Sequence, residues 1–175
     1  MQDLKAARAE IFVAIGSIAL NAVREYYVGL LTAAGAKVIN CISPRSYRAD
    51  TAYEGKNLYI DATSILCPFT RLGQNVVLFN ASISHHCEIG DNASINGARI
   101  GANCRIGRNS VIALSATIES GVTIGDYCLI DSGVLVKQDL PSNSVASMIP
   151  SRIRSVDSRR VKIFGESYLG FQRRK

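Results

Sequence analysis

The chain has 175 residues, is 47% hydrophobic and carries a net charge of +6. Its length suits one compact domain, or one domain with a small subdomain, and its composition allows a substantial core. No apolar run is long enough to span a bilayer, and the first residues, MQDLKAARAE, are too charged for a signal peptide. We therefore expect a cytoplasmic protein without a transmembrane segment.

Residues 1–50 predict a small βαβ subdomain. Two apolar segments flank a helical one, and strand–helix–strand of this length gives a parallel pair with a right-handed crossover. The expected elements are a buried strand over 10–15, a helix over 18–34 that is capped by Ser17 and stopped by Gly35, and a second buried strand over 36–43. A linker over 50–57 follows.

Aliphatic residues then recur at every sixth position, with steps of five only after Leu72 and after Ile95. A period of six fits neither a helix nor an alternating strand, and it is typical of a parallel β-helix built from hexapeptides. A β-sandwich is the alternative, but its turns would recur every eight to twelve residues. The series is Ile60, Leu66, Leu72, Val77, Ile83, Ile89, Ile95, Ile100, Ile106, Ile112, Ile118, Ile124, Ile130 and Val136.

Each hexapeptide predicts a short strand and a corner. The aliphatic side chain points inward and stacks on those of neighbouring coils, which together supply the core. A second inward position, four residues later, is mostly small and includes Cys87, Cys104 and Cys128, which we interpret as small core residues. The hexapeptide run over 58–140 predicts about four to five coils of an all-β solenoid, a left-handed parallel β-helix.

Residues 141–175 form a C-terminal extension after the coils. We expect a strand-like segment over 144–149 to run back along the prism, and a short helix around 156–164. Residues 151–175 contain eight basic and two acidic residues, which accounts for the whole net charge. Such a cationic segment suits phosphates, a membrane surface or an acidic partner, or it is a solvated terminus.

The chain has two histidines, His85 and His86, which are adjacent and precede the inward Cys87. A neutral imidazole is the usual general base for removing a proton from an amine or a hydroxyl. From composition alone, two ordinary surface histidines are the simpler interpretation. A metal site needs three or four ligands, so we expect none here.

The segments VAIGSIALNAVRE, AKVINCIS, ISHHCEIGD and SMIPSRIRS, together with the hexapeptides, resemble the acyltransferases of the sialic-acid O-acetyltransferase type. This family includes N-acetyltransferases that act on nucleotide-linked amino sugars in bacterial surface-glycan biosynthesis. The resemblance covers roughly residues 10–155. Its narrowest signals are the VAIG segment and the motif that reads Ile83-Ser84-His85-His86-Cys87-Glu88-Ile89-Gly90.

The resemblance implies that His85 is the general base of a direct transfer from acetyl-CoA to a sugar amine or hydroxyl. It also implies a homotrimer whose active sites lie between neighbouring solenoids, and a partial Rossmann-like fold for the N-terminal subdomain. No nucleic-acid partner is implied. The remaining expected site residues are His86 and Glu88 in support of the base, Asn80 and Ser94 for the substrate, and Gly107, Gly125, Arg152 and Arg154 for CoA.

Three features depart from the family pattern. His86 stands where the family has an acidic residue that orients the base. Ser94 stands where many members have a second histidine. The Gly-rich turn that binds the nucleotide in the family has no counterpart in these residues, so residues 1–50 are interpreted as a truncated half of that subdomain.

The departures leave a second hypothesis open. A trimeric β-helix relative without catalytic activity would act as a binding or scaffold protein. A γ-class carbonic anhydrase shares the fold but needs three metal-binding histidines, which two adjacent ones do not provide. The first prediction remains an acetyl-CoA-dependent acyltransferase with a sugar acceptor.

Overall fold

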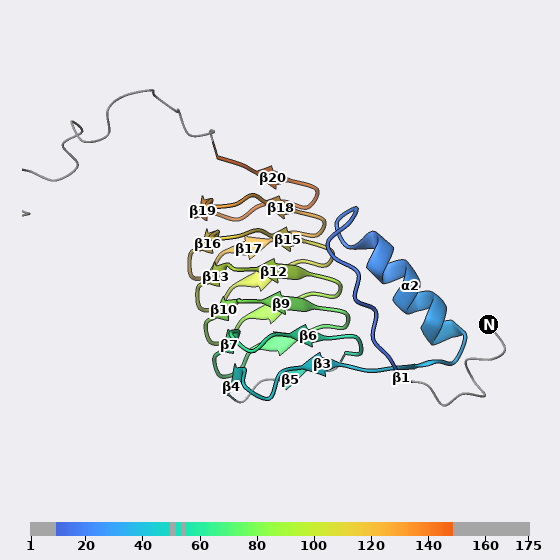
Figure 1. Ribbon diagram of the computed structural model, residues 1–175. Helices are drawn as coiled ribbons and strands as arrows, with labels where there is room; N and C mark the ends of the chain where they lie inside the picture. The colour runs from blue at the N-terminus through green and yellow to red at the C-terminus, as the bar shows by residue number, and fades with distance from the viewer. Residues whose placement is uncertain (1–9, 50–51, 54, 149–175) are drawn as a thin grey trace, which may run out of the picture.

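The computed structural model describes residues 10–49, 52–53 and 55–148. Short parallel strands form three sheets, and the chain climbs from one coil to the next as a solenoid (Figure 1). One helix and a two-stranded sheet lie to one side of the coils (Figure 1). The predicted all-β solenoid with a small N-terminal α/β region is therefore confirmed.

The three sheets of the solenoid have six, five and seven strands, and we name each sheet by its number of strands. The six-stranded sheet contains β4 (Tyr47–Arg48), β7 (Ile65–Leu66), β10 (Ser82–Ile83), β13 (Arg99–Ile100), β16 (Thr117–Ile118) and β19 (Leu135–Val136). The five-stranded sheet contains β5 (Ala52–Tyr53), β8 (Arg71–Leu72), β11 (Glu88–Ile89), β14 (Arg105–Ile106) and β17 (Thr123–Ile124). The seven-stranded sheet contains β3 (Cys41–Ile42), β6 (Tyr59–Ile60), β9 (Val77–Phe79), β12 (Ser94–Asn96), β15 (Val111–Ile112), β18 (Leu129–Ile130) and β20 (Val145–Ala146).

Stacked aliphatic side chains fill the interior. Ile83 pairs in register with Leu66 below it and Ile100 above it, and all three are at most 1% exposed. The thiols of Cys87, Cys104 and Cys128 are also fully buried, as predicted for the small inward positions. The solenoid has about six turns rather than four to five, because β3 and β4, which precede residue 58, already belong to its sheets.

One inward position was wrongly predicted. Leu78, not Val77, pairs with Ile60 and Ile95 and is fully buried, whereas Val77 faces outward and is only partly covered. The first five-residue step therefore follows Leu78. Both shortened steps then fall between the seven-stranded and the six-stranded sheet, where two residues each (80–81 and 97–98) join the strands. We call this edge the short corner.

The N-terminal region is a parallel pair, β1 (Glu10–Ile11) and β2 (Lys37–Val38), joined by helix α2 (Ala22–Ala33). The helix ends as predicted at Gly35, which has a φ of 75° and donates to Thr32 O. Its start differs from the prediction, because residues 19–21 form a left-handed turn and Asn21, not Ser17, is the N-cap. The predicted strand over 36–43 is two strands, and the second belongs to the solenoid.

A column of buried asparagines lines the edge where the five-stranded sheet passes into the seven-stranded sheet, which we call the asparagine corner. Their left-handed backbone is one that Asn tolerates better than most residues. The Nδ2 atoms of the first three side chains each donate to Oδ1 of the next, at 2.9 Å, 2.8 Å and 3.2 Å along the column. The column is Asn57, Asn75, Asn92 and Asn109.

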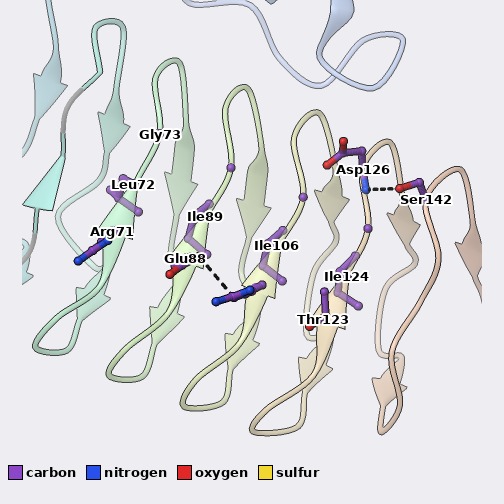
Figure 2. A pocket seen from close by; sticks show the side chains of 14 residues that line it. Arg71, Leu72, Gly73, Glu88, Ile89, Ile106, Thr123, Ile124, Asp126 and Ser142 are labelled. Carbon is purple, nitrogen blue, oxygen red and sulfur yellow. Dashed lines mark hydrogen bonds and ion pairs between the residues drawn. The ribbon is translucent and has the colours of Figure 1, made fainter.

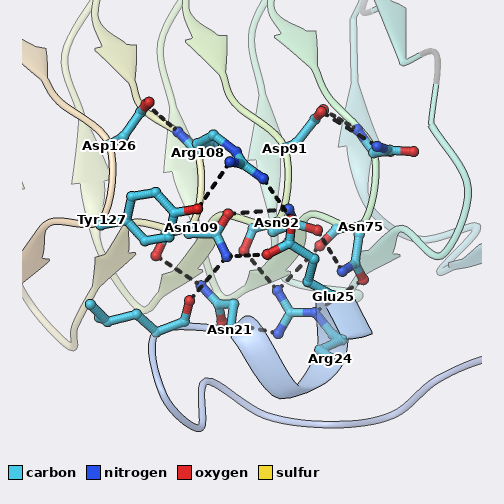
Figure 3. Close-up of polar contacts among 12 residues, drawn as sticks. Asn21, Arg24, Glu25, Asn75, Asp91, Asn92, Arg108, Asn109, Asp126 and Tyr127 are labelled. Atoms are coloured by element: carbon cyan, nitrogen blue, oxygen red, sulfur yellow. Dashed lines mark hydrogen bonds and ion pairs between the residues drawn. The ribbon is translucent and has the colours of Figure 1, made fainter. Parts of the chain in front are cut away.

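Arg24 attaches helix α2 to this column (Figure 3). Its side chain is fully buried, and desolvation lowers its pKa to about 10, which still leaves it charged at neutral pH. None of its acceptors in the described residues is a carboxylate. Its nitrogens donate at 3.0–3.2 Å to oxygens of Ile15, Asn21, Asn75, Asn92 and Ser94.

The last described strand, β20, pairs with β18 in parallel and so continues the coil, rather than running back along the prism. The helix expected around 156–164 and the basic segment 151–175 lie outside the described residues. None of the helices in the described part of the chain is long and apolar enough to cross a membrane.

Candidate functional site

His85 and His86 lie on the edge where the six-stranded sheet passes into the five-stranded sheet, which we call the histidine corner. Both side chains are exposed, and their Nδ1 atoms are 2.9 Å apart, so one ring donates a hydrogen bond to the other. His86 has a φ of 58°, a left-handed conformation in which His is enriched. Phe69 occupies the equivalent place one coil below, and its ring centroid lies 4.8 Å from that of His86.

Cys87 follows the histidines, but its thiol points into the core. Its Sγ lies 3.0 Å from the carbonyl oxygen of Gly101, to which the thiol donates. The hydrogen bond with Cys104 and burial raise the pKa of the Cys87 thiol. Cys87 is therefore a neutral core residue and not an activated nucleophile.

A groove of about 540 Å³ follows the five-stranded sheet beside the histidine corner (Figure 2). Four glycines line one side of it, so we call it the glycine groove: Gly73, Gly90, Gly107 and Gly125. Arg71, Glu88 and Arg105 project from its strands, and Glu88 pairs with Arg105 at 3.4 Å. Arg71 makes no side-chain hydrogen bond or ion pair within the described residues, so its guanidinium is available to an anion.

The two glycines predicted to bind CoA, Gly107 and Gly125, both line this groove. Close packing of the coils also explains why they are glycines. A Cβ on Gly107 would lie 2.4 Å from the carbonyl carbon of Gly125, and a Cβ on Gly125 would lie 2.4 Å from Ser142 N. The missing side chains allow the coils to stack and keep this wall of the groove bare backbone.

Two hollows of about 630 Å³ and 390 Å³ lie on the six-stranded sheet, on the other side of the histidine corner. They share Ser82, Arg99 and Thr117, so we treat them as one surface, the hydroxyl groove. It extends from the short corner to Ser84, which directly precedes His85. Its other hydroxyl-bearing residues are Thr63, Ser115 and Ser120.

Asp61 supports the short-corner end of the hydroxyl groove. Its carboxylate accepts hydrogen bonds from Ser64 Oγ, Thr63 Oγ1 and Asn80 N. Partial burial alone would raise the pKa of this carboxyl, but the hydrogen bonds from Ser64, Thr63 and Asn80 outweigh it and lower the pKa.

The predicted substrate residues separate in space. Asn80 lines the hydroxyl groove and is exposed. Ser94 is fully buried, donates to Asn21 Oδ1 and accepts from Arg24, so it belongs to the attachment of helix α2. Glu88, expected to support the base, pairs with Arg105 and has no hydrogen bond or ion pair with either histidine within the described residues. Arg152 and Arg154 lie outside the described residues.

Three residues beside the site were not predicted from the sequence. Arg71 and Arg99 each occupy the outward position of a strand, one in each groove, and the hexapeptide pattern shows only that such positions are exposed. Phe69 stands in a corner position with a left-handed backbone, where a bulky aromatic residue is uncommon, and this was the available signal in the sequence. No group of three or more metal-ligating side chains occurs within the described residues.

Comparison of the sequence with models of protein families, and with curated proteins, gave no match. The structure, in contrast, is similar to solved acetyltransferases. A mutant GDP-perosamine N-acetyltransferase from Caulobacter crescentus, solved with CoA and GDP-perosamine, has a TM-score of 0.79 and 21% identity, with 89% of this chain and 74% of that chain covered.

The acetyltransferase domain of PglB from Neisseria gonorrhoeae, solved with acetyl coenzyme A, has a TM-score of 0.73 and 24% identity. That match covers 78% of this chain and 66% of the other. The chain thus has the hexapeptide-repeat β-helix fold found in these acetyltransferases, as the resemblance implied.

Proposed function

We propose that the protein is an acetyltransferase that transfers the acetyl group of acetyl-CoA to an amine or hydroxyl of a nucleotide-linked sugar. The observation that carries this proposal is the exposed His85, held in a hydrogen-bonded pair on an edge between two grooves. The fold shared with acetyltransferases that were solved with CoA or acetyl-CoA supports it. The nucleotide-linked sugar is suggested by the GDP-perosamine bound to one of those structures, and the context of bacterial surface-glycan biosynthesis rests on the sequence resemblance.

In the proposed reaction, Nε2 of His85 removes a proton as the acceptor nitrogen or oxygen attacks the thioester carbonyl carbon. The tetrahedral intermediate then collapses, the carbon–sulfur bond breaks, and the CoA sulfur leaves with the proton that His85 carried. No covalent enzyme intermediate is needed. The core position of Cys87 supports direct transfer, because the thiol that directly follows the histidines is neutral and faces inward.

The two grooves differ in a way that suggests their ligands. The glycine groove has a backbone wall beside Gly107 and Gly125, and Arg71 suits the phosphates of CoA. The hydroxyl groove offers hydroxyls, the Asn80 amide and the single guanidinium of Arg99, a set suited to a sugar phosphate. Arg152 and Arg154 remain proposed CoA phosphate ligands.

The proposed assembly is a homotrimer, since flat solenoid faces suit a rotational contact. Light scattering on the purified protein tests it. A mass three times the 18.9 kDa of the chain supports the trimer, and a monomer at micromolar concentration contradicts it. The proposed location is the cytoplasm.

A non-catalytic binding protein is the second candidate. The observation in its favour is that the carboxylate nearest in sequence to the histidines, Glu88, pairs with Arg105, so no carboxylate orients His85 within the described residues. Such a protein would bind CoA without transferring its acyl group.

Thermal unfolding with CoA, acetyl-CoA and nucleotide sugars tests ligand binding. A ligand at 100 times its Kd adds about 2.7 kcal/mol of stability. Stabilisation by acetyl-CoA and by a nucleotide amino sugar supports the enzyme. Stabilisation by CoA alone favours the binding protein, and the absence of any shift contradicts both.

A further inference from the structure

The histidine corner contains an exposed aromatic residue whose position the hexapeptide pattern does not explain. Phe69 is 57% exposed and has a φ of 63°, which is unfavourable for a bulky side chain. The equivalent residue two coils above is Asn103, with a φ of 57°. An Asn would therefore suit the backbone at residue 69 better, which points to a role for the ring.

That contact is with His86. The rings of Phe69 and His86 lie 4.8 Å apart, tilted by 43°, and the ring of His85 meets His86 edge-on at 88°. His86 thus lies between an apolar ring and its neighbour, with Nδ1 directed at Nδ1 of His85. Stacking of this kind restricts the ring of His86 although the side chain is exposed.

The Nδ1–Nδ1 contact fixes the tautomers of the pair. One of the two nitrogens must carry the hydrogen and the other must be bare, because two bare or two protonated nitrogens repel each other at 2.9 Å. If His85 donates, its Nε2 is bare and basic. If His86 donates, the hydrogen of neutral His85 lies on Nε2, and His85 cannot accept a proton there.

We infer that Phe69 and His86 are positioning residues that act together on His85: Phe69 holds the His86 ring, and His86 Nδ1 accepts the Nδ1 hydrogen of His85. This arrangement leaves Nε2 of His85 as the basic nitrogen. The inference rests on the proposed function for its consequence in catalysis, but the tautomers themselves are a property of the free protein. His86 then does with a neutral ring what a carboxylate does beside many catalytic histidines.

The surroundings offer no competing partner for either ring among the described residues. On the adjoining strand and the coil above, Glu88 pairs with Arg105, and on the six-stranded sheet Glu119 pairs with Lys137. Arg71 and Arg99 are cations and cannot accept the His85 hydrogen. Neither imidazole forms an ion pair with these groups, so within the described residues each Nδ1 has the other Nδ1 as its hydrogen-bond partner, and the base role proposed for His85 selects His85 as the donor.

Because the chain has only two histidines, long-range ¹H–¹⁵N NMR spectra of the ¹⁵N-labelled protein report both tautomers directly. At a pH where both rings are neutral, we expect His85 to carry its hydrogen on Nδ1 and His86 on Nε2. The reverse assignment, or Nε2–H on both rings, overturns the inference whether or not the protein is an enzyme.

Variants separate the two positioning residues. Phe69→Asn suits the left-handed backbone but removes the stacked ring, so we expect a mixture of His85 tautomers and a kcat reduced about tenfold with unchanged KM for acetyl-CoA. Phe79→Asn is the matched control, because Phe79 is also exposed but lies at the short corner. If Phe69→Asn leaves the tautomers as in the unmodified protein, Phe69 has no positioning role.

At position 86, Gly suits the positive φ and removes the acceptor, whereas Asp supplies an acceptor. His86→Gly should lose the Nδ1–H form of His85 and most of kcat, and His86→Asp should restore both. Equal tautomers in the two variants contradict the role of His86. Correct tautomers without acetyl transfer would instead count against the proposed function alone.

Discussion

Nε of Arg24, on helix α2, donates a hydrogen bond of 3.1 Å to Oδ1 of Asn75, in the asparagine column of the solenoid. This contact joins residues 51 positions apart and places a buried cation among neutral oxygens. Charge-assisted hydrogen bonds are stronger than neutral ones, and a buried acceptor that loses its donor is costly. The N-terminal region therefore depends on Arg24 for its attachment.

Replacement of this side chain should be severe. We expect Arg24→Met to lower the free energy of unfolding by about 3 kcal/mol or more, because several buried oxygens lose their donor together. Urea denaturation measures the change. Arg45→Met is the control at an exposed arginine, and it should change stability by less than about 0.5 kcal/mol. Equal effects of the two variants would show that the network contributes nothing specific.

The glycines of the groove wall give a second prediction. Gly107→Ala places a Cβ 2.4 Å from the carbonyl carbon of Gly125, so we expect destabilisation by about 1–3 kcal/mol. Gly29→Ala, in helix α2, meets no atom within 4 Å and should stabilise the protein by about 0.5–1 kcal/mol. Thermal unfolding of both variants checks the opposite signs.

Asp61 gives a prediction on pH. Its pKa is lowered in the folded state, so the stability it contributes is present above the unfolded value of about 3.9 and is lost as the pH falls through the folded value. Asp61→Asn should therefore destabilise the protein more at pH 7 than at pH 3. Denaturation at the two pH values measures this, and an equal loss at both would contradict the hydrogen-bonded carboxylate.

Arg71 and Arg99 test which groove receives CoA. If CoA lies in the glycine groove, Arg71→Gln should weaken CoA binding about tenfold, and Arg99→Gln should leave it unchanged. Titration calorimetry measures both affinities. The opposite result would place CoA in the hydroxyl groove and the sugar in the glycine groove. If the lost affinity for CoA is electrostatic, the difference between the variant and the unmodified protein should be smaller at high salt.

The sequence was sufficient for the solenoid because each inward aliphatic is part of a repeat, as Ile83, Ile100 and Ile118 show. It was ambiguous where two neighbouring residues are both aliphatic. Val77 and Leu78 fit the period equally well. The five-residue step can lie before Val77 or after Leu78, and in both cases the next aliphatic residue of the series is Ile83. Only the stacking on Ile60 and Ile95 distinguishes them.

Long-range polar contacts were not accessible in the same way. Arg24 occupies an ordinary helical position, and nothing local indicates that its side chain is buried against the asparagine column. The same holds for Ser94, which stands where many members of the family have a second histidine and was therefore expected to contact the substrate, but whose hydroxyl bonds to Asn21. His85 and His86 were identifiable as candidates, yet the pairing of their Nδ1 atoms depends on the corner geometry and on Phe69.

The most direct test of the proposed function is the rate of CoA release from acetyl-CoA in the presence of nucleotide amino sugars, for the unmodified protein and for His85→Ala. We expect acceptor-dependent release by the unmodified protein, and a kcat lower by roughly 10²–10⁴-fold in His85→Ala with little change in CoA affinity. Acceptor-dependent release at the same rate by both proteins would contradict the role of His85 as the base, and the absence of such release from the unmodified protein would contradict the proposed transferase.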